Sequence, residues 1–132
     1  MFFRNLTLFR FPELPRRALS AFDKHLADHR LRPCGPIEMA TQGFVSPFGR
    51  DSEELTHRVG KNTLFCLGGE DKLLPSSVIS EALAVKIGEI TEKEARRVSA
   101  RERKRLKEEV LTDLLPRAFV KPSRTFAWLT ED

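Results

Sequence analysis

The chain has 132 residues, of which 40% are hydrophobic and 32% are charged. This length and composition fit one globular domain, and no apolar run approaches the about 20 residues of a membrane span. Lys and Arg outnumber Asp and Glu by 23 to 19, and this small excess permits an anionic partner without requiring one.

The N-terminal quarter predicts a strand followed by a helix. Residues 2–11 are rich in Phe and Leu on both alternating faces, which is typical of a strand covered on both sides. Pro15 fits the first turn of a helix that runs to about Arg30, and its inner face would include Phe22 and Leu26.

The middle of the chain is rich in turn-forming residues. Residues 31–62 predict loops with one short strand around Phe44 and Val45. Residues 63–67 predict a second strand, apolar on both faces, and residues 68–71 (Gly-Gly-Glu-Asp) predict a turn after it. The two cysteines, Cys34 and Cys66, form no Cys-x-x-Cys pair and predict buried, reduced thiols.

A long helical region follows and ends in a strand. Ser76 or Ser77 would cap the first helix, and Ile79, Leu83, Ile87 and Ile90 would form its buried face. Capping-box patterns at Thr91 and Ser99 predict that residues 77–118 form two or three pieces, the last ended by Pro116. Residues 125–129 then predict a strand that pairs with earlier strands or with chain beyond this sequence.

These elements predict an α+β fold: a mostly antiparallel sheet with packed helices and a long basic helical excursion at about 77–118. Residues 1–132 would be a single domain or the N-terminal portion of a larger subunit. Because no secretion signal or membrane span is found, we expect a cytoplasmic protein with no membrane contact.

The strongest charge signal lies at residues 93–107, which hold eight basic and two acidic residues. They can bind the phosphates of nucleic acid, or they can be a solvated helix face with its own pairs, such as Glu92–Arg96, Glu94–Arg97 and Glu102–Arg105. The spacing of Arg97, Arg101 and Lys104 would put them on one helix face. The candidate DNA-binding residues are Lys72, Arg97, Arg101, Lys104, Lys107, Arg117, Lys121 and Arg124.

No aromatic residue interrupts the basic stretch and Tyr is absent, so a duplex suits it better than a single strand stacked on aromatic rings. Phe119, just after the helical region, is either a core aromatic or an exposed anchor at a subunit interface, with Leu115 beside it. His25 and His29 are one helical turn apart, but Leu26 follows the first histidine where a zincin motif needs Glu, and a third metal ligand would have to come from Asp28, His57 or elsewhere. We expect no metal, cofactor, small-molecule substrate or enzymatic activity.

Several blocks, in this order and spacing, resemble the N-terminal part of the RdgC family of bacterial recombination-associated proteins. The blocks are Phe3-Arg4-Asn5-Leu6 with Phe9-Arg10, Pro33-Cys34-Gly35 with Gly43-Phe44-Val45 and Pro47, Leu55-Thr56-His57, Lys72-Leu73-Leu74-Pro75-Ser76 with Val78-Ile79, Leu83 and Lys86-Ile87, and Leu106-Lys107 with Glu109-Val110 and Leu114-Leu115-Pro116-Arg117-Ala118-Phe119.

The resemblance implies a double-stranded DNA-binding protein of the nucleoid, whose subunits pair into a ring-shaped homodimer around DNA and limit access of the RecA recombinase. Family members are longer, so this chain looks like less than half of one. A second interpretation keeps the fold but changes the function. The chain would then be an interaction or scaffold module that docks through residues 77–119 and does not bind DNA alone.

Overall fold

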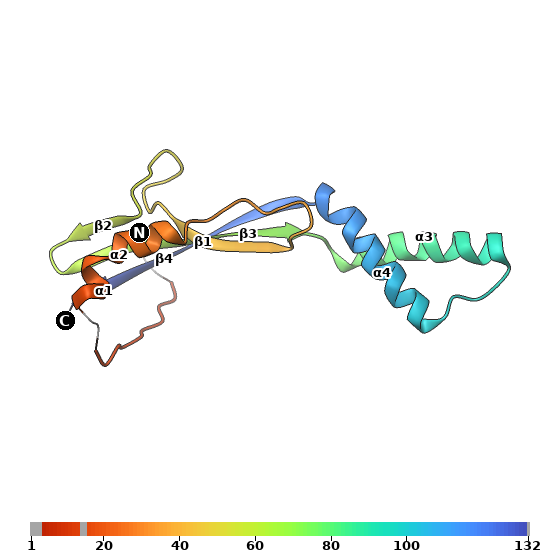
Figure 1. The fold of residues 1–132 in the computed structure, drawn as a ribbon, viewed down its shortest axis with the longest axis horizontal. Helices are drawn as coiled ribbons and strands as arrows, with labels where there is room; N and C mark the ends of the chain where they lie inside the picture. Colours follow the sequence, from red (N-terminus) through yellow and green to blue (C-terminus); the bar gives the residue numbers. More distant parts are fainter. Residues whose placement is uncertain (1–3, 14–15, 132) are drawn as a thin grey trace.

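The computed structural model describes residues 4–13 and 16–131 and shows an elongated molecule (Figure 1). An antiparallel sheet with two short helices forms one end, and a pair of longer helices projects from the other. This arrangement confirms the α+β class, the antiparallel sheet and the long helical excursion. In the described part of the chain, no helix is long and apolar enough to cross a bilayer.

The sheet is built around one long central strand. Its strands are β1 (Ala40–Val45), β2 (Thr56–Val59), β3 (Asn62–Leu73) and β4 (Phe119–Thr130). β4 pairs antiparallel with β3 along all 12 residues, while β1 and β2 pair antiparallel with separate halves of β3. Since β4 occupies one whole edge of β3, β1 and β2 share the other edge. Within the described residues, the outer edge of β4 pairs with no strand.

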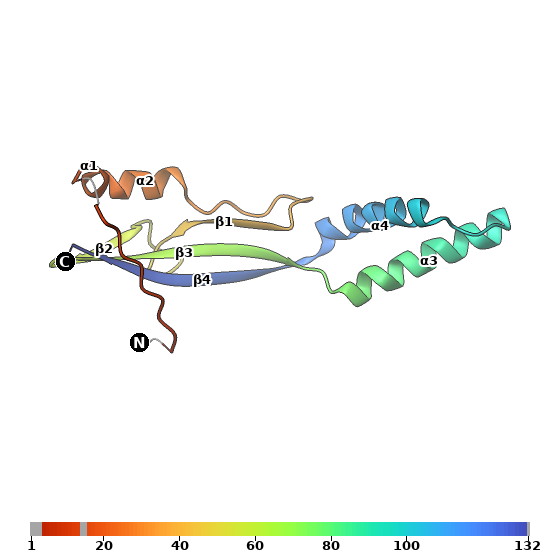
Figure 2. The ribbon, with the colours of Figure 1, turned by 90° about the horizontal axis from the view of Figure 1, so that it is seen from below.

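Two short helices, α1 (Arg16–Ser20) and α2 (Phe22–Asp28), cover one face of the sheet (Figure 2). The Phe22 ring meets the Phe65 ring edge-on at 5.3 Å between centroids, and Leu26 is 3% exposed. At the edge of this contact the Thr56 hydroxyl donates to the Asp23 carboxylate at 2.6 Å. The predicted inner face with Phe22 and Leu26 is therefore confirmed.

The connection from α2 to β1 stays close to the sheet. Leu31 N–H donates to the Phe44 carbonyl at 3.1 Å, and Phe44 N–H donates to the His29 carbonyl at 2.9 Å. Further along, the backbone N–H of Cys34 donates to the Glu70 carboxylate at 2.8 Å. Both cysteines are free thiols, and Cys66 is fully buried in β3 as predicted, whereas the predicted burial of Cys34 is wrong because this residue is half-buried.

The predicted strand at residues 2–11 is wrong for residues 4–11, which are irregular and exposed; residues 1–3 lie outside the described part of the chain. Leu8 and Phe9 are each 81% exposed. A strand needs a neighbour for its backbone groups, and in the described residues no strand pairs with this segment. The predicted start of the first helix at Pro15 also lies outside the described residues; the helix begins at Arg16 in the part that is described.

The predicted turn at residues 68–71 is also wrong, because these residues continue β3. β2 was not predicted, since it has four residues and its charged and polar side chains resemble a loop. The structure extends the last strand to 12 residues because β3 offers a partner along that whole length.

The helical excursion consists of α3 (Ser76–Glu94), α4 (Ala100–Leu114) and a 3-10 turn, η1 (Leu115–Arg117). We call these residues, 76–117, the helical arm. The cap at Ser99 is confirmed: its hydroxyl accepts from Glu102 N–H at 3.2 Å. The cap at Thr91 is wrong, because its hydroxyl donates to the Ile87 carbonyl within α3. The predicted Ser caps of α3 are also wrong, since Pro75 holds that position without a side-chain cap.

Ala95 ends α3 in a left-handed conformation, with φ at 49°. A Cβ atom disfavours that conformation, so Ala95→Gly is expected to stabilise the protein by about 1 kcal/mol. Urea unfolding of both proteins measures this difference. Ala84→Gly, at an exposed position inside α3, is the control and is expected to destabilise by about 1 kcal/mol. Equal destabilisation by both substitutions would contradict the prediction.

Candidate nucleic-acid interface

The helical arm holds its basic residues on the outside because its apolar residues are used between the two helices. Leu83 of α3 and Leu106 and Val110 of α4 are each at most 6% exposed. Lys86 of α3 reaches across to α4, with its amine 3.3 Å from the Asp113 carboxylate and 3.7 Å from that of Glu109. The buried contact fixes the rotation of α4, and this rotation decides which charges face solvent.

Arg101 and Lys104 lie on the solvent face of α4. Successive helical residues are about 100° apart, so these two point well away from Leu106 and Val110. Both are exposed, and they line a shallow surface hollow together with Arg105 and the acidic residues Glu102 and Glu108. Within residues 4–13 and 16–131, neither Arg101 nor Lys104 makes an ion pair.

Other predicted members of the basic face are placed differently. Arg97 is exposed but precedes α4, which starts at Ala100, so the predicted common helix face of Arg97, Arg101 and Lys104 is wrong. Lys107 lies on the flank of α4, about 100° from Leu106. The structure therefore brings Arg101 and Lys104 together, with Arg97 and Lys107 at the margins of the same arm.

The predicted ion pairs within the basic stretch do not form, and a different set replaces them. Arg96 donates to the Glu102 carboxylate through two bonds of 2.7 Å, and it also contacts Glu94. These hydrogen bonds from Arg96 hold the pKa of the Glu102 carboxyl below its usual value. Arg105 lies 3.6 Å from Glu109. Part of the positive charge is thus used inside the arm, as the solvated-helix interpretation expects, but Arg101 and Lys104 remain available.

The candidates on the sheet do not extend this face. Lys72 is the cross-strand partner of Val120, so the two side chains lie on the same face of the sheet. Lys121 follows Val120 in β4 and therefore points to the opposite face. Arg124 donates to the Ser46 carbonyl, and its guanidinium lies 5.6 Å from the Phe126 ring centroid. Arg117 is exposed at the end of η1.

Phe119 and Leu115 sit where the arm meets the sheet, but their surroundings differ. Phe119 is 83% exposed, which contradicts the core alternative and leaves the exposed-anchor alternative open. Leu115 is 7% exposed, so its side chain belongs to the interior of the arm. Leu73, the cross-strand partner of Phe119, is 50% exposed and continues the apolar surface.

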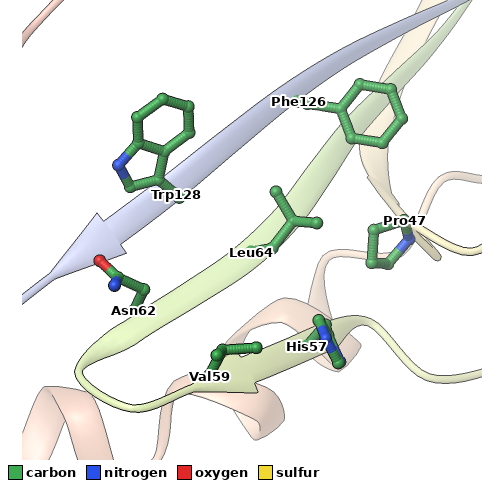
Figure 3. A pocket seen from close by; sticks show the side chains of 7 residues that line it. All are labelled: Pro47, His57, Val59, Asn62, Leu64, Phe126 and Trp128. Atoms are coloured by element: carbon green, nitrogen blue, oxygen red, sulfur yellow. The ribbon is translucent and has the colours of Figure 1, made fainter. Parts of the chain in front are cut away.

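A second surface feature was missed in the sequence. Figure 3 shows side chains that line a hollow of about 560 Å³ on the sheet face opposite α1 and α2. We call it the apolar shelf; it includes His57 and Val59 of β2, Asn62 and Leu64 of β3, and Phe126 and Trp128 of β4. The alternation of apolar residues at positions 64, 126 and 128 is the signal that could have revealed it.

Among the residues that the structure describes, no group of three or more His, Cys, Asp or Glu side chains is placed to hold a metal ion. His57 instead stacks edge-on against Phe48, at 5.1 Å between ring centroids.

Comparisons with known proteins agree with the resemblance of the residue blocks. A family model described as "Putative exonuclease, RdgC" matches residues 1–132. Curated relatives named recombination-associated protein RdgC, from Xanthomonas axonopodis pv. citri and Stenotrophomonas maltophilia, are 52% and 50% identical over 130 residues. These residues are 98% of this chain and 42% of each relative, so the chain spans about two fifths of the relatives' length.

Proposed function

This chain belongs to the RdgC family, and from that premise we propose that its helical arm binds double-stranded DNA without sequence preference. The observation that carries the proposal is the exposed face with Arg101 and Lys104, which make no ion pair within the described residues. Lys and Arg neutralise phosphates, and such contacts fix a protein on a duplex without reading bases.

The shape of the molecule suits a backbone contact. The helical arm projects beyond the sheet, so its solvent face can approach DNA without obstruction by the rest of the chain (Figure 1). Residues 93–107 contain no aromatic side chain on which unpaired bases could stack. These features favour a duplex over a single strand.

The role in recombination follows from the relatives, which are named recombination-associated proteins. We propose that the complete protein acts in the nucleoid, where coverage of duplex DNA limits access of RecA. The complete subunit would form a ring-shaped homodimer, with Phe119 as the exposed contact and Leu115 supporting it from inside the arm. The description of the family model also mentions an exonuclease. We propose that the protein binds DNA without cleaving it.

Salt dependence tests the proposed DNA binding. A fluorescent duplex of scrambled sequence is titrated with the protein at 50 and 200 mM salt, with Mg²⁺ present. About four phosphate contacts would weaken binding about 150-fold between these salt concentrations. An unrelated duplex of equal length is the control and should bind equally well. Salt-independent binding, a strong sequence preference or shortening of the duplex would each contradict the proposal.

The exposure of Phe119 supports a second candidate function, docking onto another protein surface through the helical arm. An aromatic residue that is 83% exposed is a typical anchor of an interface. If docking is the function, Phe119→Ser abolishes self-association in sedimentation experiments while DNA binding is absent from the start. If the arm binds DNA, Phe119→Ser leaves the affinity of one subunit for a short duplex within about twofold.

A further inference from the structure

The turn between α3 and α4 ties one arginine of the basic stretch to two carboxylates. This turn, which contains Arg96, lies at the free end of the helical arm (Figure 1). The Arg96 guanidinium donates to both oxygens of the Glu102 carboxylate at 2.7 Å and also contacts the Glu94 carboxylate. One cation thus has two anionic partners, so its charge is more than neutralised within the arm.

The geometry of this contact is that of a phosphate-binding arginine. Two parallel N–H groups of a guanidinium match the two oxygens of a carboxylate, and they match two oxygens of a phosphate equally well. The Arg96 side chain is 43% exposed, whereas the Glu102 side chain is only 17% exposed. The arginine can therefore be reached from solvent, and Glu102 occupies the position in which Arg96 would hold a DNA phosphate.

The pair lies beside the proposed DNA-binding face. Glu102 lines the surface hollow together with Arg101 and Lys104, and these two cations are exposed. Because Arg96 is bonded to Glu102, its guanidinium lies at the border of the same hollow. A phosphate that approaches Arg101 or Lys104 would come close to the Arg96 guanidinium and to the carboxylate that binds it.

We propose that Arg96 is a further phosphate-binding residue of the helical arm, and that Glu94 and Glu102 keep it from DNA. This inference rests on the proposed function, because it concerns the same DNA-binding face. In the unmodified chain, transfer of Arg96 to a phosphate would leave two unpaired carboxylates beside that phosphate, and repulsion between these like charges would cancel the gain. The two glutamates therefore hold the affinity for DNA below the value that the basic residues of the arm could provide.

The other ion pairs of the helical arm do not impose the same restraint. Arg105 meets Glu109 at 3.6 Å, and the Arg105 side chain is 68% exposed. An exposed pair with one long contact contributes little, so Arg105 can turn to a phosphate at small cost. Among the arginines in residues 4–13 and 16–131, Arg96 is the one that contacts two carboxylates.

The test is a release variant, Glu94→Gln with Glu102→Gln. Glutamine keeps the size of each side chain and is tolerated in a capping box, so the cap at Ser99 should remain. The variant is expected to bind the scrambled duplex about tenfold more tightly than its matched control at 100 mM salt, because it gains one phosphate contact. The slope of the logarithm of affinity against the logarithm of salt concentration should become steeper by about 0.9. Fluorescence anisotropy at four salt concentrations gives both quantities.

The matched control is Glu92→Gln with Glu108→Gln. Both glutamates are exposed on the arm, they make no ion pair in the part of the chain that the structure describes, and Glu108 lines the same hollow. The control changes the net charge by the same amount but releases no arginine. It is expected to raise the affinity by at most about threefold and to leave the slope unchanged. Circular dichroism checks that both variants keep their helices.

Arg96→Gln shows whether Arg96 is the source of the gain. In the unmodified chain this substitution is expected to change the affinity by at most about threefold, since Arg96 does not contact DNA there. In the release variant it is expected to lower the affinity about tenfold and to return the slope to its original value. Such non-additive effects are expected only when the substituted residues interact.

The outcomes separate this inference from the proposed function. If the unmodified chain binds the duplex and the release variant gains no more than the control, the inference is wrong and the proposed function stands. A tenfold loss from Arg96→Gln in the unmodified chain would also overturn the inference, because Arg96 would already bind a phosphate. If only the release variant binds, the inference is supported and DNA binding by the unmodified arm is wrong. No binding by any of the folded proteins would overturn both.

Discussion

Replacement of Gly43 by alanine is expected to destabilise the protein by about 3 kcal/mol, because the added methyl group would collide with backbone. A Cβ atom at Gly43 would lie 2.3 Å from the Leu31 nitrogen and 2.5 Å from the Arg30 carbonyl carbon. Backbone atoms cannot rotate away as the end of a flexible side chain can. The segment at residues 29–31 would have to leave β1, with the loss of its hydrogen bonds to Phe44.

Urea unfolding, followed by far-ultraviolet circular dichroism, measures the change in the free energy of unfolding. Gly88→Ala is the matched control, since nothing lies within 4 Å of a Cβ atom at that position in α3. Alanine is the better helix former, so this control is expected to stabilise by about 1 kcal/mol. A Gly43→Ala protein as stable as the unmodified chain would mean that residues 29–31 do not pack against β1 in solution.

The same close packing explains why the sequence misled at residues 68–71. The pair Gly68-Gly69 is typical of a turn, but both residues continue β3. A Cβ at Gly68 would lie 2.8 Å from a methyl group of Val45, and one at Gly69 would lie 2.7 Å from the Ser123 hydroxyl. Glycine is needed there for space and not for an unusual backbone conformation. Sequence alone does not distinguish these two reasons, because the neighbours come from distant parts of the chain.

Elements whose signals are local were predicted well. The apolar face of α3, the cap at Ser99 and the helix end before Pro116 depend on residues within a few positions of one another, although on that face only Leu83 is buried and Ile79, Ile87 and Ile90 are half-buried. The strand at residues 6–11 was not confirmed, because a strand exists only through its neighbour, and that neighbour is set by the tertiary fold.

The candidate site likewise has one part that the sequence predicts and another that depends on the tertiary fold. The basic stretch is visible in the sequence, but the charges that remain available depend on the turn between the helices. Ala95 ends α3 in the left-handed conformation, which brings Arg96 to Glu102 instead of the predicted Glu92. Arg97 is left before α4 by the same turn. Only the structure could therefore select Arg101 and Lys104 from eight basic residues.

The double substitution Arg101→Glu and Lys104→Glu is expected to weaken binding to duplex DNA about 100-fold at 100 mM salt. Each change removes one cation and places an anion beside the phosphates. The slope of the logarithm of affinity against the logarithm of salt concentration should become shallower by about 1.8, since each lost phosphate contact accounts for about 0.9. Fluorescence anisotropy with the scrambled duplex at four salt concentrations gives both quantities.

The substitution separates binding from folding. Both side chains are exposed, and glutamate near the start of α4 interacts favourably with the helix dipole, so the helical arm should stay folded. Circular dichroism and urea unfolding check this expectation.

The matched control is Arg17→Glu with Lys24→Glu, two exposed residues of α1 and α2. It changes the net charge by the same amount, at the opposite end of the molecule from the helical arm (Figure 1). If the helical arm is the contact, the control substitutions lower the affinity for duplex DNA by at most about threefold, because only the net charge of the protein changes. Equal losses in both proteins would mean that binding reflects total charge, and the assignment of the interface to Arg101 and Lys104 would be wrong. Unchanged binding in the arm variant, with a loss in the control, would move the DNA contact to the sheet end of the molecule.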